Sequence, residues 1–281
     1  MSTIAVIGSV NLDLVATVKK LPVPGETVTD AQLNRFPGGK GANQALAAKR
    51  LGADVQLIAC VGDDSAADEA LALLRDGGVD LSHLVVAEGT PTGTALIAVA
   101  PSGENHIVVA PGANRRLAPE VLEVPTADAL ICQLEVPADT VARAAAEFDG
   151  LFCVNLAPAK QVDVTVLQRA ELVIVNELEA AWYGDTLGAC PGMIVTTVGA
   201  AGATISKGGE DIAVARPPRI EAVDTTAAGD TFTAALTVAL VEGQSPQEAL
   251  EFACAAGAAA CTKLGAQPSL PTCEEVASLR T

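Results

Sequence analysis

The segment Asp224-Thr-Thr-Ala-Ala-Gly-Asp230 places small residues and two carboxylates directly before a stretch with helical spacing. The small side chains of Ala227, Ala228 and Gly229 allow their backbone N–H groups to approach a single anion. The first turn of a helix leaves such donors unpaired, and its dipole adds about half a positive charge. A carboxylate at Asp230 would repel that anion unless it accepts a proton from the attacking group. The segment therefore predicts phosphoryl transfer to a hydroxyl, with Asp230 as the base.

Helix capping is the structural alternative for the same residues. Asp224, Asp230 and Thr231 are residue types that cap helices, and Gly229 is common in turns. Both interpretations place a helix start here, and they differ only in what its first turn binds. Other parts of the chain are needed to decide between them.

Two polar side chains follow the first apolar segment, Thr3–Ile7. Asn11 and Asp13 alternate with apolar residues, so both should lie on one face of an extended segment. Carboxylate and amide groups together can hydrogen-bond the hydroxyls of a polyol. A solvated strand face is the alternative, and we favour the polyol site.

A glycine-rich run, Gly38-Gly-Lys-Gly-Ala-Asn43, comes before a second stretch with helical spacing. Such a run suggests that the backbone closely approaches a ligand. It is not a Walker A loop, because Gly41 rather than Ser or Thr follows Lys40. It does not match the dinucleotide fingerprint either.

The middle of the chain alternates apolar segments with helical ones, which predicts an α/β fold with a mostly parallel sheet. The expected strands are Thr3–Ile7, Val55–Cys60, Ala129–Leu134, Leu151–Val154, Leu172–Val175 and Met193–Thr197. These strands end in polar residues such as Gln133, Glu135 and Asn155, which predicts a ligand crevice at their carboxyl ends. Helices are expected at Gln44–Arg50, Ser65–Asp76, Thr231–Val241 and from Ser245 to Lys263.

Four further segments do not fit a parallel sheet. They lie at about 12–18, 28–36, 91–100 and 104–110, and the last two flank a turn that reads Pro101-Ser-Gly-Glu104. We expect them to form a small antiparallel lid within a single domain that spans residues 1–281.

Composition limits the classes of partner. The chain has 281 residues, a formal net charge of −17 and 2% aromatic residues. That charge repels nucleic acids and anionic membranes, and few aromatic side chains are available to stack on bases. The expected partners are small molecules, and an anionic substrate would have to be bound by backbone dipoles or a metal.

The seven cysteines show no C-x-x-C pairing, and most lie in apolar segments. Buried free thiols are typical of a reducing compartment, so a cytoplasmic protein is expected. The start Met-Ser-Thr-Ile-Ala-Val-Ile-Gly has no basic segment and is expected to be a strand rather than a signal peptide.

The two motifs, Gly38–Asn43 and Asp224–Asp230, resemble the signatures of the ribokinase-like (PfkB) sugar and nucleoside kinases. The similarity runs from Ile4 to Pro271. Further matching pieces are Gly8–Asp13, Pro24–Thr27, Gln133–Glu135, Asn176–Glu179, Thr197–Gly199 and Gly265–Ser269. The resemblance implies a central, mostly parallel sheet flanked by helices, with a β lid that often forms a homodimer.

The resemblance also implies roles for individual residues. Asp230 would be the base, and the amides of Ala227, Ala228 and Gly229 would form the anion hole. The sugar-contacting positions would be Asn11, Asp13, Gly39, Lys40, Asn43 and Glu135. The nucleotide positions would be Asn176, Thr197, Gly199, Gly202, Gly229 and Cys254, with Glu179 organising Mg²⁺ and phosphate through water. A monovalent cation, usually K⁺, would be bound at Asp224, Thr226, Ala260, Lys263, Gly265 and Ser269.

The implied activity is phosphorylation of the 5-hydroxyl of D-ribose by ATP. Another pentose, deoxyribose or a nucleoside is the alternative substrate. One feature departs from the family: the span from Asn176 to Thr197 is shorter by about one helix, so Ala181–Pro191 is expected to cross over almost without a helix. A sugar-binding regulatory protein with impaired ATP binding is therefore a second alternative.

Overall fold

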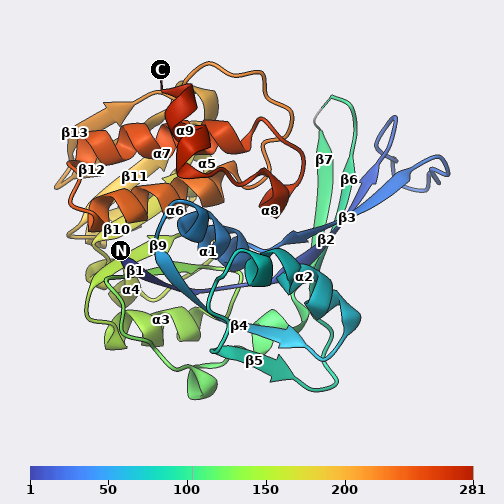
Figure 1. The fold of residues 1–281 in the computed structure, drawn as a ribbon, viewed down its shortest axis with the longest axis horizontal. Helices are drawn as coiled ribbons and strands as arrows, with labels where there is room; N and C mark the ends of the chain where they lie inside the picture. Colours follow the sequence, from blue (N-terminus) through green and yellow to red (C-terminus); the bar gives the residue numbers. More distant parts are fainter. Residues whose placement is uncertain (103, 281) are drawn as a thin grey trace.

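A large, mostly parallel sheet forms the centre of the molecule (Figure 1). The computed structural model describes residues 1–102 and 104–280. Within these ranges nine strands pair in the order β13-β12-β11-β10-β9-β8-β1-β4-β5. Neighbours are parallel from β11 to β5, and β12 and β13 are antiparallel additions. The strands are β1 (Thr3–Ile7), β4 (Asp54–Gly62), β5 (Leu84–Ala87), β8 (Ala129–Gln133), β9 (Leu151–Asn155), β10 (Leu172–Asn176), β11 (Met193–Thr197), β12 (Ala203–Lys207) and β13 (Glu210–Ala215).

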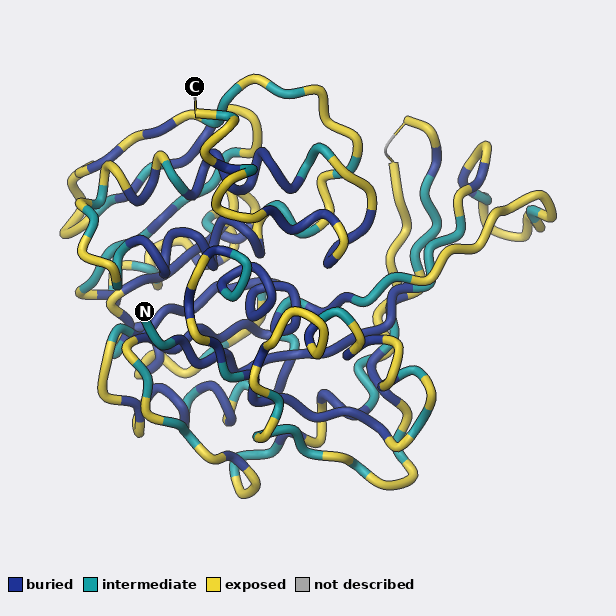
Figure 2. The backbone as a smooth tube through the Cα atoms, in the orientation of Figure 1, coloured by how far each residue is buried: buried dark blue, intermediate teal, exposed yellow. Residues whose placement is uncertain are grey.

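Helices cover both faces of this sheet, and each face has its own apolar core. One face is covered by α1 (Lys40–Arg50), α2 (Ser65–Asp76), α6 (Ala228–Val241), α7 (Pro246–Ala260) and α9 (Cys273–Leu279). The other is covered by α3 (Ala138–Glu147), α4 (Val164–Arg169) and α5 (Glu177–Tyr183). The tube in Figure 2 shows the buried residues concentrated in these layers. The predicted fold class is therefore confirmed.

Short helices complete the chain. These are α8 (Ala266–Ser269) and the 3₁₀ segments η1 (Gly112–Arg116), η2 (Pro119–Val121), η3 (Gly184–Ala189) and η4 (Gly199–Ala201). No helix in the described ranges is long and apolar enough to cross a membrane.

A second sheet, which we call the lid sheet, projects from the body (Figure 1). It consists of β2 (Asn11–Thr17), β3 (Gln32–Gly38), β6 (Gly93–Val99) and β7 (Asn105–Ala110), in the order β3-β2-β6-β7. We expected antiparallel strands, but β2 and β6 are parallel. The expected strand at 28–36 begins only at Gln32, because Gln32 pairs with Thr17, where β2 ends. Of the predicted turn between β6 and β7, Gly103 lies outside the described residues.

Three helix boundaries differ from those expected. Helix α1 begins at Lys40 and α6 at Ala228, each ahead of the expected start, while α7 ends at Ala260 rather than Lys263. Strand β5 was not predicted. The expectation of a crossover almost without a helix was wrong: α5 and η3 fill the span after Asn176. A capping box between Asn176 and Glu179 starts α5, which explains how so short a helix is stabilised.

Candidate active site

The candidate site lies where the strand order reverses around β1. Strands β8 and β4 flank β1 on opposite sides, and the chain leaves β1 toward the lid sheet. In open α/β sheets, ligands bind at the carboxyl ends of the strands beside such a reversal. Helices α1 and α6 pack against each other here, and their first turns carry Lys40, Asn43 and Asp230.

Asp230 is buried, with 6% of its surface exposed, and both of its carboxylate oxygens accept side-chain hydrogen bonds. Asn43 Nδ2 donates to Oδ2 at 2.8 Å, and Gln44 Nε2 donates to Oδ1 at 2.9 Å. Burial raises the pKa of Asp230, while Lys40 and the two amides act in the opposite direction. Each carboxylate oxygen can accept more than one hydrogen bond, so Asp230 can still take a proton.

Lys40 lies among several carboxylates. Burial acts to lower its pKa, but attraction to Asp230, Glu135, Glu179 and Asp13 raises the pKa above the ordinary value. Burial raises the pKa of Asp13 to about 7, with repulsion from Glu135 and Asp230 adding to the effect and Lys40 opposing it. The site therefore holds one ammonium group among carboxyl groups that come from separate elements.

The predicted pair Asn11 and Asp13 is buried at the start of β2. Asn114 Nδ2 donates to Asn11 Oδ1 at 2.8 Å, and Asn114 Oδ1 accepts from the amide of Val10 at 2.9 Å. Sequence reasoning assigned no role to Asn114. Its position in Pro111-Gly-Ala-Asn114, directly after the last lid strand, was the available signal.

The glycine-rich run makes room for the site's own side chains. A Cβ on Gly38 would lie 2.2 Å from Asp13 Oδ2. Gly39 has a φ of 90°, and a Cβ there would lie 2.7 Å from the backbone nitrogen of Asn11. We expected these glycines to let the backbone approach a ligand, and in the structure they also let Asp13 and Asn11 approach the backbone.

Glu135 fixes the start of α1. Its Oε2 accepts from Ser9 Oγ at 2.5 Å and from the backbone nitrogen of Lys40 at 3.2 Å. Asn43 Oδ1, in contrast, is buried without a hydrogen-bond partner among the described residues. Because a buried acceptor without a partner costs free energy, Asn43 Oδ1 is a natural acceptor for a ligand hydroxyl.

The predicted anion hole lies at the first turn of α6. Ala227 adopts the left-handed conformation with φ 61°, and α6 begins at the next residue. The amide of Ala228 donates to the carbonyl of Thr225 at 3.3 Å. No protein acceptor is found in the described ranges for the amides of Ala227 and Gly229, which leaves them available to an anion.

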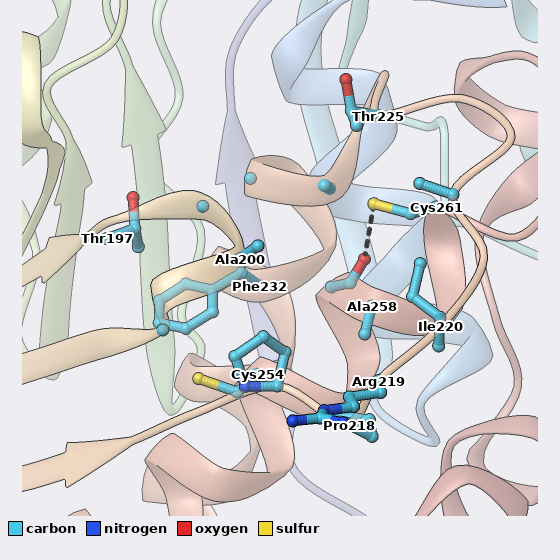
Figure 3. A pocket seen from close by; sticks show the side chains of 17 residues that line it. Thr197, Ala200, Pro218, Arg219, Ile220, Thr225, Phe232, Cys254, Ala258 and Cys261 are labelled. Atoms are coloured by element: carbon cyan, nitrogen blue, oxygen red, sulfur yellow. Dashed lines mark hydrogen bonds between the residues drawn. The ribbon is translucent and has the colours of Figure 1, made fainter.

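A cavity of about 540 Å³ adjoins this turn (Figure 3). Five predicted nucleotide residues line it: Thr197, Gly199, Gly202, Gly229 and Cys254. Apolar residues that were not predicted form much of the wall, among them Pro217, Pro218, Ile220 and Phe232. A largely apolar cavity of this size suits a nucleobase, and Gly229 connects it to the Asp230 end of the site.

Asn176 and Glu179 are not among the residues that line the cavity. Asn176 Oδ1 accepts from the amide of Glu179, and Glu179 Oε2 accepts from the amide of Asn176, both at 2.8 Å. Glu179 is buried, which raises the pKa of its carboxyl group. Its attraction to Lys40 places it on the charged side of the site.

The predicted cation loop is held together by Asp224. Its Oδ1 accepts from Thr226 N at 2.9 Å and Oγ1 at 2.6 Å, and its Oδ2 accepts from the amide of Gly265 at 2.9 Å. The amide of Asp224 also donates to the carbonyl of Cys261, one residue after Ala260. The side chain of Lys263 pairs with Glu275, and Ser269 Oγ donates to the carbonyl of Ala266. Carbonyl oxygens are therefore the groups that these loops can offer to a cation.

The chain is similar to a known family and to several known proteins along nearly its whole length. The family model described as pfkB family carbohydrate kinase matches residues 1–273. The ribokinase of Bacillus subtilis is 37% identical over 99% of both chains. The crystal structure of Thermotoga maritima ribokinase covers 100% of this chain and 99% of its own, with TM-score 0.91 and 32% identity. The structure of Arabidopsis thaliana ribokinase complexed with ribose and ATP covers 99% of this chain and 98% of its own, with TM-score 0.88 and 28% identity. This chain belongs to the pfkB family of carbohydrate kinases.

Proposed function

We propose that this protein is a ribokinase, which transfers the γ-phosphoryl group of ATP to the 5-hydroxyl of D-ribose. The observation that carries the proposal is Asp230, a buried carboxylate held by Asn43 and Gln44 at the start of α6. Its neighbour Gly229 lines a cavity large enough for a nucleotide base. Similarity to ribokinases over nearly the whole chain supports the choice of sugar and nucleotide.

The polar groups around Asp230 suit a free sugar. Asn11, Asp13 and Glu135 offer acceptors to ring hydroxyls, and Asn43 adds the buried Oδ1 without a protein partner. Lys40 balances their charge and can donate to a hydroxyl oxygen. Gly39 belongs to the same binding surface through its close approach to Asn11.

In the reaction, Asp230 accepts the proton of the 5-hydroxyl as the oxygen attacks phosphorus. The new O–P bond forms while the bond between phosphorus and the ADP oxygen breaks. The amides of Ala227 and Gly229 and the dipole of α6 stabilise the charge on the transferring group, and the amide of Ala228 joins them once it leaves the carbonyl of Thr225. A positioned base contributes on the order of a hundred- to ten-thousandfold in rate.

Two ions complete the proposal. Mg²⁺ would neutralise charge on the phosphates, with Glu179 as the residue that organises its water shell beside Asn176. K⁺ would be held by the loops that contain Asp224, Thr226, Ala260, Lys263, Gly265 and Ser269. These loops offer oxygen donors, which suit a hard cation. The carboxylate of Asp224 accepts hydrogen bonds from the amides of Thr226 and Gly265 and so holds the two loops together.

Replacing K⁺ with Li⁺ should lower activity by about fivefold or more, because the smaller ion cannot span the same carbonyl groups. The cation would act on turnover through the Thr225–Ala228 turn without touching substrate. Initial rates at constant ionic strength, with a tetramethylammonium salt as the cation-free control, measure the effect. Equal rates in all three salts would remove the cation loop from the proposal.

A coupled assay of ADP release across sugars and nucleosides tests the function directly. We expect ribose to give the highest kcat/KM, with deoxyribose and other pentoses lower. A nucleoside that turns over faster than ribose would favour the substrate alternative. Sugar binding without nucleotide binding in a calorimetric titration would favour a regulatory protein, although the preserved cavity beside Gly229 argues against it.

We further propose a cytoplasmic homodimer that assembles through the lid sheet. The consumption of ATP and the free thiols support the compartment. Strand β7 is exposed along its whole length and forms an edge of the lid sheet (Figure 2). Its Ile107, Val108 and Val109 are between 46% and 63% exposed, which is typical of a surface that is covered by a partner.

Val108→Asp should convert a dimer into a monomer, because a carboxylate would be buried without a partner in the apolar contact. Light scattering at micromolar concentration would report a halved mass. Leu178→Asp on α5 is the matched control, since Leu178 is 82% exposed and lies outside the lid sheet. A monomeric parent protein, or a dimer that survives Val108→Asp unchanged, would contradict assembly through β7.

A further inference from the structure

Three buried side-chain amides connect the central sheet to Asp230. Gln44 lies on α1, Gln133 ends β8 and Asn155 ends β9. Gln44 and Gln133 are fully buried, and Asn155 is 8% exposed. The proposed reaction gives no role to Gln133 or Asn155, yet burying an amide is costly unless its hydrogen bonds are made.

The amides form a continuous chain of hydrogen bonds. Gln44 Nε2 donates to Asp230 Oδ1 at 2.9 Å and also to Asn155 Oδ1 at 3.3 Å. Gln133 Nε2 donates to Gln44 Oε1 at 2.5 Å. At the far end, Asn155 Nδ2 donates to the backbone carbonyl of Ile174 at 3.2 Å.

The two ends of this series of hydrogen bonds determine which group donates and which accepts at each step. An ionised carboxylate and a backbone carbonyl can only accept hydrogen bonds. Ile174 therefore takes the NH₂ group of Asn155, which turns Asn155 Oδ1 toward Gln44. Gln44 then uses its NH₂ group for Asp230 and Asn155, and its oxygen is left for the NH₂ group of Gln133. A rotated amide at any one position would bring two donors or two acceptors together.

Packing around Gln133 leaves its amide little freedom. A Cβ on Gly8 would lie 2.0 Å from Gln133 Oε1, so the amide is pressed against the turn after β1. Gln133 Oε1 has no hydrogen-bond partner within the described part of the chain. This acceptor without a partner costs stability. The cost arises from the orientation of the Gln133 amide that turns its NH₂ group toward Gln44.

We propose that Gln133 and Asn155 are positioning residues, which hold the amide of Gln44 with its NH₂ group toward Asp230. In this arrangement Gln44 aims the carboxylate and favours its ionised form, which is the form that accepts a proton. Lys40, Glu135 and Asp13 also act on Asp230 electrostatically, from α1, the segment after β8 and β2. The inference rests on the proposed kinase reaction.

Variants of the two glutamines test the proposal. Gln44→Met should lower kcat about tenfold or more with the KM for ribose within threefold, because a hydrogen bond to the base is lost. The acid limb of the kcat profile should move to higher pH by about one unit, since the ionised carboxylate loses a donor. Gln133→Met should change both quantities in the same direction, by about threefold in kcat.

A double-mutant cycle shows whether Gln133 acts through Gln44. In the Gln44→Met background, Gln133→Met should have no further effect on kcat or on the acid limb. Gln56→Met, which replaces a half-buried glutamine on β4, is the matched control and should leave both unchanged. Additive effects of Gln44→Met and Gln133→Met, or a parental pH profile in Gln44→Met, would overturn the proposal that Gln133 acts through Gln44.

A readout without substrate separates this inference from the proposed function. Titration of ¹³C-labelled aspartate by NMR, with the Asp230 signal assigned from Asp230→Asn, should show its pKa raised in Gln44→Met even if ribose is not the substrate. Circular dichroism shows which variants fold. If Gln133→Met does not fold, Asn155→Leu removes the other contact of Gln44 and should also raise the pKa of Asp230. An unchanged pKa in the folded variants would overturn the proposal.

Discussion

Asp230→Asn should reduce kcat by at least about a hundredfold while ribose affinity stays within a few-fold. The amide cannot accept the proton of the 5-hydroxyl, but it keeps the size of the side chain. Asn43 can rotate its amide to meet the new NH₂ group, because Asn43 Oδ1 has no other partner in the described ranges. Turnover in the ADP-release assay and ribose binding by calorimetry give the two quantities separately.

Asp163→Asn is a suitable control, because Asp163 caps α4 on the opposite face of the sheet and should leave turnover unchanged. Turnover of Asp230→Asn within tenfold of the parent would place the base elsewhere. A large loss of ribose affinity in Asp230→Asn would instead assign Asp230 mainly to sugar binding.

The parallel sheet could be predicted because its strands are buried on both faces and read as continuous apolar runs. Strands β8, β9 and β10 appear in the sequence as such runs, each ending in a polar residue. Strand β5 was missed because only four residues pair, and they are partly exposed. The parallel pairing of β2 with β6 could not be predicted, because it depends on how the chain returns from β5 to the lid sheet.

Within the site, sequence patterns identified individual residues better than they identified the contacts between those residues. Asn43 and Asp230 are 187 residues apart in the sequence, and only the packing of α1 on α6 brings Asn43 Nδ2 to 2.8 Å from Asp230 Oδ2. Gln44 looks like an ordinary polar helix residue, so its contact with Asp230 was missed. The same holds for Asn114, whose hydrogen bonds to Val10 and Asn11 depend on the position of the lid sheet.

The glycines show a further limit of sequence reasoning. Gly38 and Gly39 were associated with close approach of the backbone to a ligand, and Gly39 stays a proposed sugar contact. The distances to Asp13 and Asn11 show that the neighbours are protein atoms. A sequence indicates where side chains must be absent, whereas the identity of what fills the space depends on tertiary packing.

Asp13→Asn should make the sugar-free protein more stable at pH 8 and weaken ribose binding by roughly ten- to a hundredfold. Burial raises the pKa of Asp13 from 3.8 to about 7, so the folded protein binds this proton more tightly than the unfolded chain does. The associated stability is fully present below pH 3.8 and is lost as the pH rises through about 7. The difference between variant and parent should therefore be small at pH 4 and about 4 kcal/mol at pH 8, because a shift of one pKa unit corresponds to about 1.4 kcal/mol.

Ribose reverses this balance in the parent, because its hydroxyl groups donate to the ionised carboxylate of Asp13 and lower its pKa. Ribose affinity of the parent should then increase as the pH rises through about 7, while that of Asp13→Asn stays level. Urea unfolding at both pH values and calorimetry with ribose measure the two effects. Equal stability of parent and variant at pH 8 would show that Asp13 carries no buried charge in the free enzyme. Ribose affinity of the variant within threefold of the parent would show that this carboxylate does not bind the sugar.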